Sequence, residues 1–274
     1  LEKLLPLMRR QGFHRDDGIV ALGGGMVGDL AGLAAGLCQR GIRWHYFPTS
    51  LLAQVDASIG GKVAVNFGGK NNVGMFYPPD AVVSDLDTLK TLPDREYRSG
   101  LAEVVKAAVV GDPGLFALLA RHDWTQLRGN APLEAQLVRR SCLVKKAVVE
   151  QDERERHHRM TLNLGHTLGH ALEEATGYGR YLHGEAVAIG LVYAARVGRR
   201  LGVTSPDLEP RLTELLLSYG LPVAWPAHGK IRLLAWMKQD KKARKGGLLL
   251  ALPEKIGKVR IVPVPDKILA ESFG

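Results

Sequence analysis

The chain has 274 residues, of which 46% are hydrophobic and 24% are charged, and its formal net charge is +9. This composition is typical of a packed globular protein of one large or two moderate domains, and it excludes a disordered chain. No apolar run approaches the roughly 20 residues needed to span a bilayer, so we expect no membrane partner. The positive charge is dispersed and no nucleic-acid-binding module accompanies it, so we expect an anionic small-molecule substrate and no nucleic acid.

The first third of the chain alternates between short apolar segments and helical ones. An apolar run at 18–25 ends in glycines, and a stretch of small and apolar residues at 27–38 predicts a helix. Segments 43–49 and 81–85 are short and β-prone. Strands separated by helices predict a parallel sheet, and therefore an α/β domain over residues 1–92.

After residue 92 the pattern becomes mainly helical. Apolar residues recur at spacings of three and four, which predicts helices over 94–110, 130–150, 161–176, 184–201 and 207–219. A strand pair is expected at 248–252 and 258–264, with a last helix at 265–273. We therefore expect a mainly α-helical second domain over residues 93–274.

A glycine turn joins the first predicted strand to the first predicted helix. Its pattern is Gly23-x-Gly25-x-x-Gly28, which is typical of a turn that binds a pyrophosphate at a helix N-terminus. The acidic residue expected about 20 positions later, which would hold a ribose, is absent from YFPTS at 46–50. The turn is either a phosphate-binding turn of another α/β family or a tight structural turn.

The segment 56–72 is rich in glycine and carries Lys62, Lys70 and Asn71. Ammonium groups and exposed backbone N–H groups suit an anionic ligand. The alternative is a solvated surface loop.

Three histidines lie close together in NLGHTLGHALEEATGYGRYLHGEAV (163–187). His166 and His170 are four residues apart and share one face of a helix. The spacing is known from zinc sites, but Thr167 replaces the glutamate of the protease motif. His183 begins the next predicted helix, and a hairpin could return it beside His166. Two imidazoles, one carboxylate and an open position make a catalytic zinc site, whereas core or capping roles are the alternative.

Two carboxylates are candidates for the third ligand. Glu185 lies near His183, and Glu103 lies on a small and apolar helical segment where a charge needs a partner. That partner is either a metal or Lys106, one turn away. Upstream residues that could face the same site are Lys145, Arg159 and Asn163, although the charge run DERER (152–156) is equally typical of a solvated face.

The two cysteines, Cys38 and Cys142, form no CxxC pair. They exclude an all-cysteine metal site and suit a reducing compartment, so we expect a cytoplasmic protein.

Taken together, the motifs resemble those of the 3-dehydroquinate synthase family of sugar-phosphate cyclases, in the family's order and over nearly the whole chain. The residues that carry the resemblance are LGGGMVGDLAG (22–32), RGIRWHYFPTSLLAQVDASIGGK (40–62), GKNNVGMFYPP (69–79), LKTLP (89–93), GLAEVVK (100–106), DERE (152–155), NLGHTLGHALE (163–173), LHGEAVAIG (182–190) and DKK (240–242).

The resemblance implies roles for individual residues. The metal, zinc or alternatively cobalt, would be held by Glu103, His166 and His183, and His170 would transfer protons and contact the substrate. NAD would lie near Gly24, Gly25, Asp29, Thr49, Asp56, Lys70, Asn71, Thr91 and Glu96. The substrate would be bound by Lys62, Asn71, Lys106, Lys145, Arg159, Asn163 and one of Lys241 and Lys242. Arg40 would reach into the site of a neighbouring subunit, which implies a homodimer.

The implied activity is conversion of 3-deoxy-D-arabino-heptulosonate 7-phosphate to 3-dehydroquinate and phosphate, with NAD regenerated in each cycle. This step belongs to the shikimate pathway, which leads to chorismate and the aromatic amino acids. The alternatives are another sugar-phosphate cyclase, a metal-dependent alcohol dehydrogenase, or a non-catalytic NAD-binding remnant.

Family members carry further residues before the position of Leu1, so we expect the first domain to lack its usual first part. Other departures are a link at 63–72 that is one residue shorter, Asn72 in place of an apolar residue, and His157–His158 where a glycine-bearing turn is common.

Overall fold

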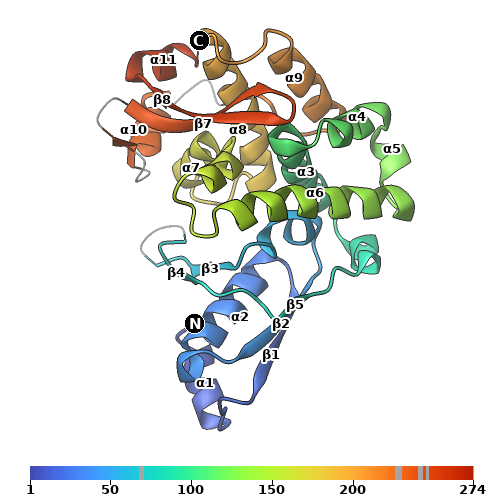
Figure 1. Cartoon of the computed structure of the whole chain (residues 1–274), viewed down its shortest axis with the longest axis vertical. Coiled ribbons are helices and arrows are strands. Elements are labelled where there is room, and N and C mark those ends of the chain that lie inside the picture. The colour runs from blue at the N-terminus through green and yellow to red at the C-terminus, as the bar shows by residue number, and fades with distance from the viewer. Residues whose placement is uncertain (68–70, 226–229, 240–242, 245–246, 274) are drawn as a thin grey trace. The chain divides into compact units, whose positions relative to one another are not determined.

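The computed structural model describes residues 1–67, 71–225, 230–239, 243–244 and 247–273. The chain divides into two compact units, Leu1–Pro93 and Asp94–Gly274 (Figure 1). The first contains a parallel sheet with helices and the second is mainly helical. The predicted fold class, an α/β part followed by a mainly helical part, is confirmed.

The first unit is built on a parallel sheet of three strands in the order β1-β2-β5. The strands are β1 (Gly18–Gly23), β2 (Arg43–Pro48) and β5 (Ala81–Val82). Helix α2 (Gly25–Leu37) connects β1 to β2, as the alternating pattern predicts. The remaining elements of this unit are α1 (Leu4–Arg10), η1 (Cys38–Arg40), η2 (Ala53–Ala57), η3 (Leu86–Thr91), β3 (Lys62–Val65) and β4 (Val73–Phe76).

Small residues on α2 let this helix lie close to the strands. Ala31, Ala34 and Ala35 are buried in one apolar cluster with Trp44 and Tyr46 of β2. Alanine adds no side chain beyond Cβ, so the aromatic rings of β2 can fill the space next to the helix backbone. This packing holds the N-terminus of α2 at the end of β1, where the glycine turn lies.

The segment 56–72, which its glycines predict to be a loop, forms regular secondary structure over part of its length. Lys62–Val65 forms strand β3, which pairs antiparallel with β4, and Ala53–Ala57 forms a short π-helical turn. Along β3, Lys62 is exposed and Val63 is buried, the alternation of a half-buried strand. The glycines at both ends obscure this short alternating run in the sequence.

The second unit is organised around two buried helices, α3 (Asp94–Gly111) and α8 (His183–Arg200). Helix α8 packs against α3, α7, α9 and β7, and most of its residues are buried. The other elements are α4 (Pro113–Arg121), α5 (Trp124–Leu127), α6 (Ala131–Gln151), η4 (His158–Asn163), α7 (His166–Ala175), α9 (Leu208–Ser218), α10 (Lys230–Gln239), β6 (Ala243–Arg244), β7 (Gly247–Lys255), β8 (Lys258–Val264) and α11 (Asp266–Glu271).

The predicted helix at 161–176 begins too early. The backbone leaves the helical region at Gly165, where φ is 79°, and His158–Asn163 forms a separate 3-10 turn. Helix α7 therefore begins at His166. The prediction also missed α4, although Asp112 caps its N-terminus and Pro113 follows, a recognised start signal. The predicted strand pair near the C-terminus is present as the antiparallel pair β7 and β8.

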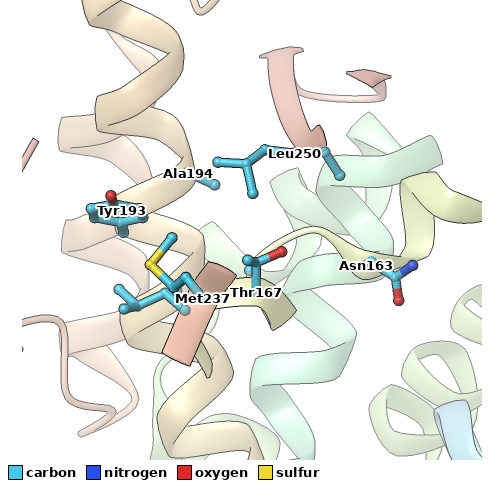
Figure 2. Close-up of a pocket in the computed structure, with 10 residues that line it drawn as sticks. Asn163, Thr167, Tyr193, Ala194, Met237 and Leu250 are labelled. Carbon is cyan, nitrogen blue, oxygen red and sulfur yellow. The ribbon is translucent and has the colours of Figure 1, made fainter. Parts of the chain in front are cut away.

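Packing around α7 and α8 leaves a cavity of only about 10 Å³, roughly the space of one water molecule. Figure 2 shows Thr167, Tyr193, Ala194 and Met237 among the side chains at its wall. The seam between these helices is therefore filled by side chains.

Among the described residues, no helix combines the length and the apolar character needed to cross a membrane.

Candidate active site

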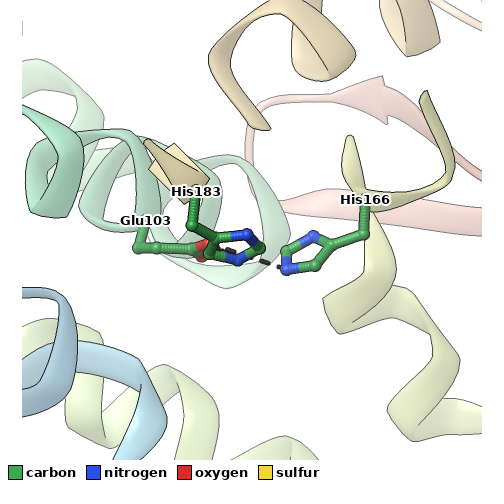
Figure 3. A group of neighbouring side chains, drawn as sticks. All are labelled: Glu103, His166 and His183. Carbon is green, nitrogen blue, oxygen red and sulfur yellow. Dashed lines mark ion pairs between the residues drawn. The ribbon is translucent and has the colours of Figure 1, made fainter. Parts of the chain in front are cut away.

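Three side chains from separate parts of the second unit converge on one point (Figure 3). Glu103 lies in the middle of α3, and His166 and His183 are the first residues of α7 and α8. The Oε1 atom of Glu103 lies 3.3 Å from Nε2 of His183 and 3.6 Å from Nε2 of His166. The ligand atoms of all three residues lie within 4.8 Å of one another.

Close contact between α7 and α8 brings the two histidines together. Gly190 of α8 passes so near Gly165 that a Cβ atom on Gly190 would lie 1.8 Å from the Gly165 carbonyl oxygen. At the start of α8, the N–H of Gly184 donates to Oγ of Ser99 on α3 at 3.0 Å. These contacts hold the first residue of α8 against both α3 and α7.

Glu103 is a buried carboxylate in a strongly positive environment. Lys106 Nζ lies 2.5 Å from its Oε2, so the predicted pairing of Glu103 with Lys106 is present alongside the histidines. Burial by itself would raise the pKa of Glu103, but the charge of Lys106, followed by His166 and His183, holds that pKa well below its usual range. In the described part of the chain, the contacts of Glu103 with Lys106 and the two histidines are ion pairs, and neither Glu103 oxygen accepts a hydrogen bond of regular geometry. The carboxylate is therefore ionised and short of directional partners.

The two imidazoles turn the same nitrogen toward Glu103. Nδ1 of His166 lies 3.1 Å from the carbonyl oxygen of Leu164, which can only accept a hydrogen bond. Nδ1 of His183 lies 3.3 Å from each carboxylate oxygen of Glu173. Burial alone would lower the pKa of His183, but Glu103 and Glu173 raise it to about 9. Each ring therefore presents Nε2 to the common point.

This donor set fits a divalent metal ion. Zinc bound by nitrogen and oxygen at tetrahedral angles keeps its ligand atoms about 3.4 Å apart, close to the two distances from Glu103 Oε1 to the imidazoles. A divalent cation at this point would bind the ionised Glu103 carboxylate together with the two imidazoles. Three protein ligands leave further positions open for a substrate.

Glu185, the alternative carboxylate, is engaged elsewhere. Arg95 binds it through Nε at 2.7 Å and through a second nitrogen at 2.8 Å, and the N–H of Leu182 donates to it at 2.9 Å. Glu185 thus caps the N-terminus of α8, whose first residue is His183. Among the described residues, neither group of potential metal ligands includes it.

His170 lies one turn along α7, next to the convergence point. Its ring stacks on His183 with centroids 5.9 Å apart and meets the edge of His166 at 5.4 Å. The sequence-based expectation that His166 and His170 share a helix face is therefore met.

The predicted substrate residues of the second unit come from three elements that pack together, α3, α6 and η4. Lys106 and Arg159 are buried, whereas Lys145 and Asn163 are half-buried. Arg159 donates to the carbonyl of Glu153, and Asn163 Nδ2 donates to Glu155 at 2.5 Å. Two residues of the charged segment 152–156 therefore accept hydrogen bonds from residues that follow it in the chain.

Asp152 organises the turn that leads to Arg159. Its carboxylate accepts hydrogen bonds from the backbone N–H groups of Arg156, His157 and Arg159 at 2.7–3.0 Å. These hydrogen bonds lower the pKa of Asp152 from 3.8 to about 2. A carboxyl whose pKa falls on folding stabilises the folded state at pH values above its unfolded pKa, and loses that contribution as the pH falls through the folded pKa.

We therefore expect the Asp152→Asn variant to be less stable than the wild type by a constant amount from pH 7 to 5. The difference should shrink as the pH falls from about 4 toward 2, where the wild-type carboxyl becomes protonated. Urea unfolding of both proteins across this range measures the difference, and other titrating groups cancel in the comparison. A difference independent of pH would show that these hydrogen bonds do not stabilise the turn.

In the first unit, the glycine turn is followed at once by a helix N-terminus, as predicted. Gly24 is the N-cap of α2, and its carbonyl oxygen accepts a hydrogen bond from the Tyr46 hydroxyl at 2.8 Å. A Cβ atom on Gly28 would lie 2.4 Å from the Tyr46 ring. This glycine is therefore required for close helix–strand packing, and the first N–H groups of α2 remain available to an anion.

Other predicted cofactor residues are distributed over this unit. Gly25 and Asp29 lie in the first turns of α2, the Thr49 N–H donates to the Gly23 carbonyl oxygen at 3.0 Å, and Asp56 lies in the π-helical turn. The exposed predicted residues of the unit are Arg40, Lys62, Asn71 and Thr91.

Glu96 lies in the second unit, on the exposed first turn of α3. Lys70, Lys241 and Lys242 lie outside the described residues.

Comparison with known proteins decides the family. Residues 1–99 match the family profile described as 3-dehydroquinate synthase N-terminal, and residues 100–243 match the one described as 3-dehydroquinate synthase C-terminal. The chain belongs to the 3-dehydroquinate synthase family. The 3-dehydroquinate synthase of Geobacter metallireducens is 49% identical over 93% of this chain and 71% of its own length. That of Acidithiobacillus ferrooxidans is 47% identical over 96% of this chain and 72% of its own.

Solved structures of related cyclases share the fold. ValA, a 2-epi-5-epi-valiolone synthase from Streptomyces hygroscopicus with NAD⁺ and Zn²⁺ bound, has a TM-score of 0.90 and 29% identity over 99% of this chain and 76% of its own. A 2-deoxy-scyllo-inosose synthase complexed with carbaglucose-6-phosphate, NAD⁺ and Co²⁺ has a TM-score of 0.89 and 28% identity over 99% and 77%. A probable glycerol dehydrogenase from Sinorhizobium meliloti, at 17% identity and a TM-score of 0.69, shares the fold alone.

Proposed function

We propose that this chain is a 3-dehydroquinate synthase, which converts 3-deoxy-D-arabino-heptulosonate 7-phosphate to 3-dehydroquinate and phosphate. The observation that carries the proposal is the difference in identity. Curated 3-dehydroquinate synthases are 46–49% identical over 93–96% of the chain, whereas the cyclases that make other carbocycles are 28–29% identical. This difference favours dehydroquinate over the product of another sugar-phosphate cyclase.

The enzyme uses NAD and a divalent metal, which we propose is zinc, with cobalt as the alternative. Glu103, His166 and His183 would hold the metal, and the glycine turn at Gly24 and Gly25 would receive the pyrophosphate of NAD. When bound, the metal polarises neighbouring hydroxyl groups of a sugar, and NAD accepts a hydride and later returns it. The burial and charge of Glu103 and the N-terminus of α2 support these two assignments.

The remaining residues bind and orient an anionic substrate. Lys106 and Arg159 place basic side chains at buried positions, where a positive charge interacts strongly with carboxylate and phosphate groups. Lys145 and Asn163 would contribute further donors from α6 and η4. His170 stacks on His183 and is close enough to the site to move a proton to or from a sugar hydroxyl. Asp29, Thr49, Asp56, Thr91 and Glu96 would contact other parts of NAD.

Release of inorganic phosphate tests the function. The purified chain, loaded with zinc and supplied with NAD, should release phosphate from 3-deoxy-D-arabino-heptulosonate 7-phosphate without net accumulation of NADH. Glucose 6-phosphate, the sugar that carbaglucose-6-phosphate imitates, should be inert. Turnover of glucose 6-phosphate instead would indicate another cyclase, and net NADH formation with an alcohol would indicate a dehydrogenase. Metal and NAD binding without phosphate release would indicate a non-catalytic remnant.

We further propose that the enzyme acts as a cytoplasmic homodimer in which Arg40 reaches the partner's site. Arg40 is exposed, and both Arg40 and the preceding Gln39 adopt positive φ, at 67° and 50°. Left-handed backbone at two consecutive non-glycine residues is uncommon and often marks functional positions.

Arg40→Ala should raise KM for the sugar phosphate about 10-fold or more, because one charge-assisted contact to an anion is lost. It should leave the oligomeric state unchanged, because a single exposed side chain contributes little to an interface. Steady-state kinetics and light scattering measure the two effects. Exposed Arg43 on β2 provides a matched control, and Arg43→Ala should change neither. Unchanged kinetics in Arg40→Ala would remove this residue from the site.

A further inference from the structure

Glu173, to which the sequence alone assigns no role, is a buried carboxylate beside the proposed metal ligands. It lies on α7, seven residues after His166, so His166, His170 and Glu173 share one face of this helix. Its exposed fraction is 6%. Both carboxylate oxygens lie 3.3 Å from Nδ1 of His183.

The opposite nitrogen of the same ring, Nε2, lies 3.3 Å from Glu103 Oε1. His183 is therefore held between two carboxylates, one on α3 and one on α7. An ionised carboxylate can only accept a hydrogen bond, so Glu173 requires the hydrogen on Nδ1. Nε2, on the side of Glu103 and His166, is then the nitrogen that a metal ion would bind in place of a proton.

His166 is oriented in a parallel way, by the Leu164 carbonyl oxygen on its Nδ1. The Leu164 carbonyl lies only two residues before His166, so this contact is local. Glu173, in contrast, reaches His183 from another helix. The Glu173 contact therefore couples the packing of α7 against α8 to the direction in which the second imidazole points. A charged acceptor on Nδ1 also makes Nε2 a stronger electron-pair donor.

We propose that Glu173 is a positioning residue for the metal site, which selects the tautomer and the orientation of His183. This inference rests on the proposed function, because it assumes that Glu103, His166 and His183 bind a divalent ion. The structure also permits a different arrangement, in which His170, Glu173 and His183 bind the ion directly. The experiment separates the two.

The test is the affinity of the full chain for Zn²⁺ and Co²⁺, measured by competition with a chelator, together with the visible absorption of bound Co²⁺. Glu173→Ala should weaken metal binding about 10- to 100-fold and change the Co²⁺ spectrum. Glu173→Gln, which keeps an oxygen acceptor but loses the charge, should have a smaller effect in the same direction. One metal ion per chain should bind in each case.

Glu174→Gln is the matched control, because it removes the same charge one residue further along α7. It should leave both metal affinity and the Co²⁺ spectrum unchanged. Far-UV circular dichroism of the metal-free variants verifies that the helices are intact, and the isosteric Glu173→Gln variant provides the test if Glu173→Ala unfolds.

Wild-type metal affinity in Glu173→Ala, or in a folded Glu173→Gln if the alanine variant unfolds, would overturn the positioning role and leave the proposed function intact. Complete loss of binding in Glu173→Ala with retention in Glu103→Ala would overturn it in favour of direct ligation by Glu173. Absence of metal binding by the wild-type chain would overturn the metal site itself.

Discussion

Replacing His166 with alanine is expected to abolish metal retention and to reduce turnover by roughly three orders of magnitude or more, since a bound metal supplies several kcal/mol of transition-state stabilisation. His166 Nε2 lies 3.6 Å from Glu103 Oε1 and is oriented by the Leu164 carbonyl. Alanine leaves two ligands, which cannot complete a tight site. Elemental analysis of the dialysed protein and the phosphate-release assay measure the two losses.

His170→Ala separates metal binding from catalysis. His170 lies one turn along the same helix and stacks on His183, and we assign it to proton transfer. This variant should therefore retain one metal ion per chain while losing turnover. Full metal occupancy in His166→Ala would contradict the ligand assignment, and loss of metal from His170→Ala would move the site toward the second group of ligands.

Gly190→Ala is expected to give the largest loss of stability of any single methyl addition at the contact between α7 and α8. Its Cβ atom would lie 1.8 Å from the carbonyl oxygen of Gly165 and 2.7 Å from the carbonyl carbon. Both atoms belong to the backbone, so no side-chain rotation relieves the overlap and the two helices must separate. Such overpacking costs about 3 kcal/mol or more, well beyond the gain of about 1 kcal/mol in helix propensity.

Chemical denaturation followed by far-UV circular dichroism measures the effect. The chain has two units, so the quantity to compare is the midpoint of the transition rather than a two-state free energy. Because His183 begins α8, metal affinity should fall together with stability. Gly169→Ala is the matched control, since its Cβ would lie 3.3 Å from backbone atoms of Ala186, which a small shift can accommodate. Equal midpoints for Gly190→Ala and the wild type would show that the interface is looser than described.

Local pattern was sufficient to predict much of the fold. Short apolar or β-prone runs and helical spacings placed β1, β2, α3, α8 and the β7–β8 pair close to their observed bounds, because each element depends on neighbouring residues. The family resemblance came from the same local motifs, and the comparisons confirm it. Prediction failed where the signal was short or interrupted. The hairpin of β3 and β4 lies between glycines, and the start of α7 depends on the left-handed backbone at Gly165.

The site itself depends on contacts between distant segments. Spacing alone left both Glu103 and Glu185 as candidates, and the family resemblance implied Glu103. The tertiary structure places Glu103 beside both imidazoles, while Arg95 and the N–H of Leu182 bind Glu185. The contact between Glu173 and His183 likewise forms only when α7 packs on α8. Sequence specifies each helix through local propensity and apolar period, but which side chains meet across helices is decided by close packing, because only the complete fold brings their backbones near enough for polar atoms to pair.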